Sequence, residues 1–181
     1  MDIHILLEKV MEGDIDAYSL IYKESYKKLY NYGRKFCTDT ALVEDCIQEV
    51  FFDLWNRKDK IKQIQSFNSY LYSSFRYTLM KKLREQKKLG SWEEAEGEEG
   101  FEFSTESVII GREQDAEKQK SLREACKQLT PRQYEAIFLR YYERLSYEEV
   151  AAVLKISVKA TYKIMARSLA ALKASVKFLL L

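Results

Sequence analysis

The chain has 181 residues, and 46% of them are hydrophobic, which is enough to build a core and excludes a disordered protein. Six glycines and one proline are too few for the many turns of hairpin and sandwich folds, so the composition favours an all-helical protein. The formal net charge of +2 is unevenly distributed, because residues 1–90 sum to about +3, residues 91–106 to −7 and residues 107–181 to about +6.

Capping residues mark the helices of the first half of the chain. Asp14 can cap a helix over about residues 15 to 36, and the side chains of residues 38–40 can cap the next one. Ser66 can cap a third helix that runs to about Lys88. In the second of these helices, the residues that recur at helical spacing and are expected to enter the core are Cys46, Ile47, Val50, Phe51, Leu54 and Trp55.

The second helix is expected to present an acidic face to solvent. With the apolar side chains in the core, the residues around the exposed face are Glu44, Asp45, Gln48, Glu49 and Phe52. This pattern is typical of a protein-docking surface. An acidic face that is only solvated would have the same pattern.

The helix after Ser66 interleaves aromatic rings with cations. Unpaired bases stack on rings while their backbone follows positive charge, so this pattern suits single-stranded nucleic acid. We expect Phe67, Leu71 and Phe75 to face the core. The candidate nucleic-acid contacts are Asn68, Tyr70, Arg76 and Lys82. The alternative is that the aromatic residues serve only the core.

The segment between the two halves differs from both in composition and charge. Residues 91–106 contain seven glutamates and no basic residue, and Gly90, Gly97 and Gly100 interrupt helix formation. Like charges repel, and little apolar surface is available to bury, so we expect a flexible acidic linker. A surface loop within one domain is the alternative. We therefore predict domains over 1–89 and 112–181, joined by a linker over 90–111.

Two capping boxes mark the second half. Thr130 with Gln133 begins one helix, and Ser146 with Glu149 begins a second, short helix. Ser157 can cap a third helix after only about two intervening residues. A short helix, a tight turn and another helix predict a helix-turn-helix.

The helix after Ser157 carries like charges on one face. Four cations are spaced by four residues: Lys155, Lys159, Lys163 and Arg167. A polyanion relieves their repulsion, and the second helix of a helix-turn-helix enters the major groove of DNA. We expect Lys159, Tyr162 and Lys163 to read bases, and Arg167 and Lys173 to contact phosphates. A basic face that is only solvated is the alternative.

These motifs resemble those of a known family. The run Asp45-x-x-Gln48-Glu49-Val50-Phe51-x-x-Leu54-Trp55 resembles region 2 of the extracytoplasmic-function (ECF, group 4) sigma factors of the sigma-70 family. The runs 129–133, 139–142, 145–151 and 156–158 resemble region 4 of the same family. The resemblance covers almost the whole chain. The motifs are also similar to those of the iron-citrate-type sigma factors abundant in the Bacteroidetes.

The resemblance implies an alternative sigma factor that binds core RNA polymerase and directs promoter recognition, DNA melting and transcription initiation. Asp45, Gln48 and Glu49 would dock on the β′ clamp helices of core polymerase, and Phe67 and Asn68 would hold open the minus-ten element. Members of the family are commonly held inactive by an anti-sigma factor, which is often embedded in the membrane.

The resemblance also implies that the second domain sits on the β flap and reads the minus-thirty-five element. The residues that would do so are Ser157, Lys159, Lys163 and Arg167. The recognition helix departs from its relatives at Ala160, where many carry Thr, and Ala160 cannot form the hydrogen bond that Thr would form. In the first domain, Tyr70 replaces the usual Trp of the family.

Other classes of protein fit less well. The only histidine is His4, and no phosphate-binding loop, nucleophile elbow or zinc-protease pair is present, so we predict no catalytic residue, metal, cofactor or small-molecule substrate. Three cysteines without metal spacing, no signal peptide and no long apolar run predict a cytoplasmic protein with reduced thiols. A polymerase-independent helix-turn-helix repressor or activator would explain the second half equally well, but not the acidic linker or the 45–55 helix.

Overall fold

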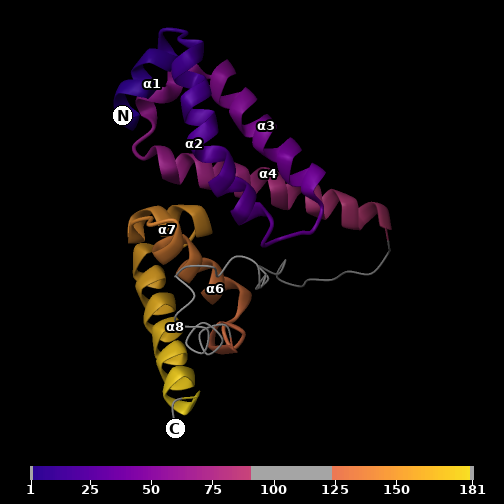
Figure 1. Ribbon diagram of the computed structural model, residues 1–181, viewed down its shortest axis with the longest axis vertical. Coiled ribbons are helices and arrows are strands. Elements are labelled where there is room, and N and C mark those ends of the chain that lie inside the picture. The colour runs from indigo at the N-terminus through magenta and orange to yellow at the C-terminus, as the bar shows by residue number, and fades with distance from the viewer. Residues whose placement is uncertain (1, 91–123, 180–181) are drawn as a thin grey trace, which may run out of the picture. The chain divides into compact units, whose positions relative to one another are not determined.

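The computed structural model describes residues 2–90 and 124–179, and side chains within 2–86 and 124–174. The chain divides into two compact units, Met1–Glu94 and Ala95–Leu181 (Figure 1). All elements in the described ranges are helical, which confirms the all-α prediction. The predicted linker over 90–111 lies outside these ranges except for residue 90. The predicted start of the second domain at residue 112 also lies outside them. In the described part of the chain, no helix is both long enough and apolar enough to span a bilayer.

The first unit is a bundle of helices. Its elements are α1 (Ile3–Met11), α2 (Ile15–Gly33), α3 (Thr40–Asn56), the 3-10 helix η1 (Lys58–Gln63) and α4 (Phe67–Gly90). The helix α2 packs against α1, α3 and α4, and α3 lies along α4 (Figure 1). The side chains at the centre of this bundle are Val10, Ile21, Leu29, Tyr32, Val43, Ile47, Phe51, Leu54, Phe75 and Leu79.

The predicted caps begin the helices of the first unit. The Asp14 carboxylate accepts a hydrogen bond from the Ala17 amide, and Asp39 caps α3 in the same way. The Ser66 hydroxyl accepts from the Ser69 amide at 3.2 Å. The helix α1 was not predicted. It places His4 in an ordered first turn, because buried apolar side chains one turn later hold it on α2.

The helix α2 ends at Gly33, about three residues before the predicted end. Two short-range hydrogen bonds close a tight turn there, from the Lys35 amide to the Tyr32 carbonyl at 3.1 Å and from the Phe36 amide to the Gly33 carbonyl at 2.9 Å. Gly33 is also a point of close approach between helices. A Cβ atom at this position would lie 2.7 Å from both the Phe75 ring and a methyl group of Val43. Only glycine lets the end of α2 pack this closely on α3 and α4.

The second unit contains the helix-turn-helix. Its elements within the described residues include α6 (Pro131–Ile137), the π-helix η4 (Phe138–Tyr142), α7 (Tyr147–Leu154) and α8 (Val158–Leu179). Both predicted capping boxes are complete, at the starts of α6 and α7. The side chains that α6, η4, α7 and α8 bury include Ala136, Leu139, Val150, Val153, Thr161 and Met165.

The turn between α7 and α8 is tightly specified. Lys155 has a φ of 52°, and the amides of Lys155 and Ile156 donate to the carbonyls of Ala152 and Ala151 at 3.2 and 3.0 Å. These two bonds form a Schellman motif with Lys155 at the left-handed position. The Arg132 side chain on α6 donates a hydrogen bond to the Leu154 carbonyl at the end of α7. The helix α6 therefore also stabilises the end of α7 before the turn.

Candidate docking groove and nucleic-acid interface

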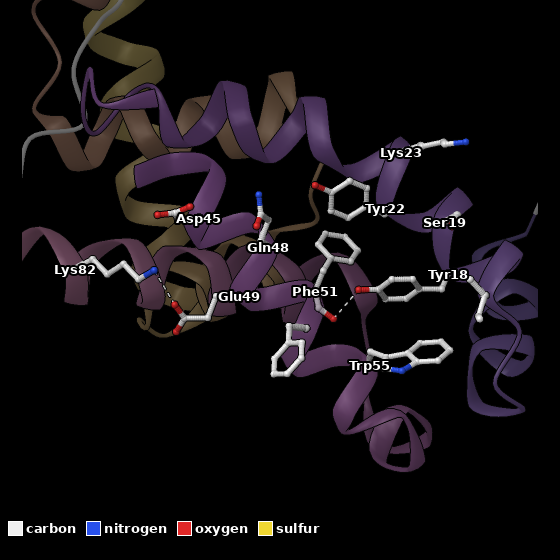
Figure 2. A pocket seen from close by; sticks show the side chains of 12 residues that line it. Tyr18, Ser19, Tyr22, Lys23, Asp45, Gln48, Glu49, Phe51, Trp55 and Lys82 are labelled. Atoms are coloured by element: carbon white, nitrogen blue, oxygen red, sulfur yellow. Dashed lines mark hydrogen bonds and ion pairs between the residues drawn. The ribbon is translucent and has the colours of Figure 1, made fainter. Parts of the chain in front are cut away.

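An open groove of about 910 Å³ lies between α2 and α3 in the first unit (Figure 2). The residues that line it are Ile15, Tyr18, Ser19, Tyr22, Lys23, Asp45, Gln48, Glu49, Phe51, Phe52, Trp55 and Lys82. All four residues predicted to bind core polymerase are among them: Asp45, Gln48, Glu49 and Phe52. The structure therefore brings the predicted docking residues together on one concave surface.

The wall of the groove is built from aromatic rings that fix one another. The Tyr18 hydroxyl donates to the Phe51 carbonyl at 3.0 Å, a bond drawn in Figure 2. The ring centroids of Tyr18 and Trp55 lie 5.0 Å apart and those of Tyr22 and Phe51 4.9 Å apart, both edge to face. Burial raises the pKa of Tyr18 and of Tyr22, so both phenols remain neutral at physiological pH. Such locked rings offer apolar surface at low entropic cost.

Two apolar side chains at the groove have most of their surface in solvent. Ile15 is 66% exposed and Phe52 is 64% exposed. Isolated exposed apolar residues are ordinary, but these two adjoin an aromatic wall and an acidic rim. That combination is the composition of a protein-docking surface.

Two of the acidic residues along α3 have partners within the unit. The Lys82 ammonium lies 2.8 Å from a Glu49 carboxylate oxygen, and this hydrogen bond raises the pKa of Lys82 (Figure 2). Directly before Asp45 in the chain, the Glu44 carboxylate accepts from the Tyr26 hydroxyl at 3.1 Å. Asp45 and Gln48 are exposed between these two contacts.

The residues predicted to meet the minus-ten strand occupy different environments on α4. Phe67 is only 8% exposed and packs in the core with Leu71 and Phe75, as the predicted inward face requires. Asn68 is exposed, and Tyr70 is half-buried with a pKa raised by desolvation.

The two cations of the same predicted set also have neighbours within the unit. The Arg76 guanidinium carbon lies 6.0 Å from the centroid of the Phe36 ring, and Lys82 lines the groove. Lys82 therefore belongs to the docking surface as well as to the predicted DNA contacts.

The four spaced cations of the second unit are all exposed, but only Lys159, Lys163 and Arg167 lie on α8, whereas Lys155 lies in the turn that precedes it. We call these four residues the cation stripe. Lys159, Lys163 and Arg167 form no ion pair with any residue that the structure describes. The opposite face buries Thr161 and Ser168, whose hydroxyls donate to carbonyls one turn earlier. The stripe therefore points away from the core of the unit.

Other predicted residues of α8 are placed as follows. Ser157 caps the helix by accepting from the Ala160 amide at 3.1 Å, and Ala160 is half-buried. Val158 and Leu169 are 37% and 41% exposed, at the edge of the buried face. In the described residues, no three His, Cys, Asp or Glu side chains are grouped so that they could hold a metal ion.

Sequence reasoning missed two features of these surfaces. One is the contribution of α2 to the groove, which the recurrence of Tyr18, Tyr22 and Tyr26 at every fourth position could have indicated. The other is a contact between the two helices of the helix-turn-helix. The Tyr147 and Tyr162 rings are stacked with centroids 4.2 Å apart and planes 9° apart.

Comparisons with known proteins agree with this architecture. The family model Sigma-70 region 2 matches residues 21–89, and the model Sigma-70, region 4 matches residues 119–172. The ECF RNA polymerase sigma factor SigK of Mycobacterium sp. (strain KMS) is 23% identical over 167 residues, which cover 90% of this chain and 83% of that protein. SigK of Mycobacterium ulcerans (strain Agy99) is 20% identical over 151 residues, which cover 83% of this chain and 80% of that protein.

Two solved structures share the fold. CnrH, solved in complex with the cytosolic domain of CnrY, has a TM-score of 0.59 and 19% identity, with 96% of each chain covered. The sigma factor RpoE of Bartonella quintana, solved with the anti-sigma factor NepR, has a TM-score of 0.55 and 17% identity, with 86% of this chain and 95% of that chain covered. Because region 2 and region 4 occur in order on two helical units, the chain belongs to the sigma-70 family and is an ECF-type alternative sigma factor that directs transcription initiation.

Proposed function

We propose that the two units divide the work of this sigma factor. The first unit binds core RNA polymerase and the melted minus-ten strand, and the second reads the minus-thirty-five element as duplex. The observation that carries the proposal is the convergence of Asp45, Gln48, Glu49 and Phe52 on one groove. The protein then acts in the cytoplasm as an initiation factor without catalysis of its own.

The chemistry of the groove favours a helical partner with apolar and basic side chains. Exposed Ile15 and Phe52 supply apolar anchors, and Asp45 and Glu49 supply acidic groups that attract cations. The β′ clamp helices of core polymerase, which the family resemblance implies as the partner, would meet this surface. Glu49 would exchange Lys82 for a cation of the partner, or keep both.

The cation stripe supports the DNA-binding part of the proposal. Lys159, Lys163 and Arg167 form no ion pair with a described residue, so a polyanion would stabilise these like charges, and each phosphate contact would release counterions. Ser157 caps α8, and Lys159 and Lys163 lie in its first two turns, where a recognition helix meets base edges. Arg167, one turn further along, is suited to phosphate.

The minus-ten contacts are proposed on α4. Asn68 is exposed at its first turn, and Tyr70 and Arg76 keep part of their surface in solvent. The buried ring of Phe67 supports the position of this turn from inside. Lys82 would have to leave Glu49 in order to contact DNA.

An anti-sigma factor is the further partner that we propose. The structures of CnrH and RpoE were each solved with a protein partner, named as an anti-sigma factor for RpoE. Such a partner would inhibit this chain by covering the groove. The narrower kinship with the iron-citrate-type sigma factors of the Bacteroidetes is supported only by the style of the motif runs.

In vitro transcription with bacterial core polymerase on a randomised promoter library tests the proposal. The variant Asp45→Ala with Phe52→Ala should bind core at least tenfold more weakly, because it removes an acidic group and an exposed anchor. The control Glu24→Ala removes an equally exposed acid from α2 outside the groove lining and should bind as the unchanged protein does. Tight, sequence-specific binding to duplex DNA without polymerase would instead support a stand-alone regulator.

A further inference from the structure

We propose that Tyr162 acts in promoter recognition as a positioning residue, through its stack on Tyr147, and not as a base contact. The inference deepens the proposed function and rests on it, because it assumes that α8 enters the major groove. Sequence reasoning placed Tyr162 with Lys159 and Lys163 among the residues that read bases. In the structure, its ring stacks on the Tyr147 ring.

The contact joins the two helices of the helix-turn-helix at a distance from the turn. Tyr147 is the first residue of α7, and Tyr162 lies in the second turn of α8. Their rings are almost parallel, with planes 9° apart and centroids 4.2 Å apart. Tyr162 remains 53% exposed, while the Tyr147 ring covers one face of its ring. The stack therefore sets the orientation of the Tyr162 ring and leaves only one face of it open.

Tyr147 is itself held in place. The Arg140 guanidinium carbon lies 5.0 Å from the centroid of the Tyr147 ring, within the range of a cation–π contact. Arg140 is anchored in turn, because its guanidinium donates to the Leu145 carbonyl at 2.8 Å. The capping box of Ser146 and Glu149 fixes the backbone on which Tyr147 sits. Tyr162 therefore stacks on a ring that is restrained both through its backbone and through a neighbouring side chain.

Tyr162 lies beside two residues of the cation stripe, so its stack on Tyr147 affects how they are oriented. Tyr162 directly precedes Lys163 and follows Lys159 by three residues, so all three lie on neighbouring turns of one side of α8. Fixing one side chain of a helix against a neighbouring helix limits rotation of that helix about its own axis. The stack thus sets the direction in which Lys159 and Lys163 leave α8. A change in that direction alters base discrimination more than total attraction to DNA.

The test uses the full chain with core polymerase. A cognate promoter is first selected from a randomised library with the unchanged protein, and a second template differs only in its minus-thirty-five bases. Discrimination is the ratio of transcription from the two templates. It is measured for Tyr147→Ala, Tyr147→Phe, Tyr162→Ala and Tyr162→Phe, together with the melting temperature of each variant.

We expect both Ala variants to lose discrimination by about threefold to tenfold, the range of an aromatic pair. Both Phe variants keep a ring and should stay within about twofold of the unchanged protein. The double Ala variant should be no worse than either single one, because one interaction is removed in all three cases.

Three results would overturn the inference. Loss in Tyr162→Ala with none in Tyr147→Ala would make Tyr162 a direct contact. A Tyr162→Phe variant as poor as Tyr162→Ala would assign the effect to the hydroxyl. Equal loss on both templates, together with lower melting temperatures, would reduce the stack to a purely structural role. If the unchanged protein shows no discrimination with polymerase, it is the proposed function that fails.

Discussion

The two proposed binding surfaces of this sigma factor differ in whether their charged side chains are paired. Around the groove of the first unit, Glu49 is paired with Lys82 and Glu44 accepts from Tyr26. On α8 of the second unit, Lys159 and Lys163 have no ion-pair partner among the described residues. The comparison indicates that shape and apolar surface dominate binding at the groove, whereas electrostatic attraction dominates at the cation stripe. Salt should therefore weaken the second interaction much more than the first.

The largest effect is expected from the cation stripe. Replacing Lys159 and Lys163 with Ala should cost about 2 kcal/mol or more of promoter binding, or roughly thirtyfold, and should flatten its dependence on salt. Core binding should be unchanged. Filter binding of holoenzyme to promoter DNA between low and moderate salt measures both quantities. Equal loss of core binding would contradict the division of labour, and Lys127→Ala, which removes an exposed lysine paired with Glu124, is the control.

A substitution that disturbs the helix packing at Gly33 should destabilise only the first unit. Gly33→Ala would place a Cβ 2.7 Å from the Phe75 ring and from Val43, both fully buried, so we expect it to cost about 1–3 kcal/mol of stability. Chemical denaturation followed by circular dichroism measures this cost, and weaker core binding should accompany it. The control Asn31→Ala alters a half-buried position on the same helix and should cost less. A neutral Gly33→Ala would show that the packing around the groove is looser than described.

The pH dependence of stability should reveal the buried thiol of the first unit. Burial raises the pKa of the Cys46 thiol from 9.0 to about 11, so the folded first unit keeps this proton when the unfolded chain has lost it. The contribution of this thiol to stability is therefore fully present below pH 9 and is lost between pH 9 and 11. Burial also raises the pKa values of Cys37 and Cys126, and several tyrosines with raised pKa values contribute at higher pH, so a Cys46 variant is needed to separate this contribution.

Cys46→Ala is the variant that isolates this contribution. It should be less stable than the unchanged protein at pH 8, since it leaves a small cavity, but it should lose less stability between pH 9 and 10. One pH unit limits the difference to about 1.4 kcal/mol. Denaturation midpoints at the two pH values measure it. Parallel curves for both proteins would exclude the thiol as the titrating group.

The smallest effect on stability should come from the ion pair at the groove. Glu49 and Lys82 are partly exposed, so Glu49→Gln should cost less than about 1 kcal/mol of unfolding free energy. Its effect on core binding should be larger than its effect on stability, because Glu49 lies in the groove. Lys82→Gln is the matched variant. If it weakens core binding as much as Glu49→Gln does, the pair acts as a unit.

The sequence contains local signals that predict where helices begin. Asp14, Thr130 and Ser146 each cap a helix as expected, because a cap needs only its own side chain and an amide two or three residues later. The exposed side of α3 and the cation stripe could also be predicted, since helical spacing alone separates buried from exposed residues.

Contacts between helices could not be predicted in this way. The stack of Tyr147 on Tyr162 and the pairing of Glu49 with Lys82 join residues whose proximity depends on the packed fold. Phe67 is the converse case, because its helical spacing with Leu71 and Phe75 predicted the buried ring that the packing shows. Sequence periodicity identifies the face of one helix, but not which side chain of another helix will meet it.

The fluorescence of one side chain in the groove would report whether that surface is occupied. The chain has two tryptophans, Trp55 and Trp92, and Trp55 lines the groove with its ring against Tyr18 and under the Lys58 ammonium at 4.7 Å. A Trp92→Phe variant would leave Trp55 as the sole indole fluorophore. A polymerase fragment or an inhibitor seated in the groove would displace water from the indole and shift its emission, so occupancy could be followed without any attached dye.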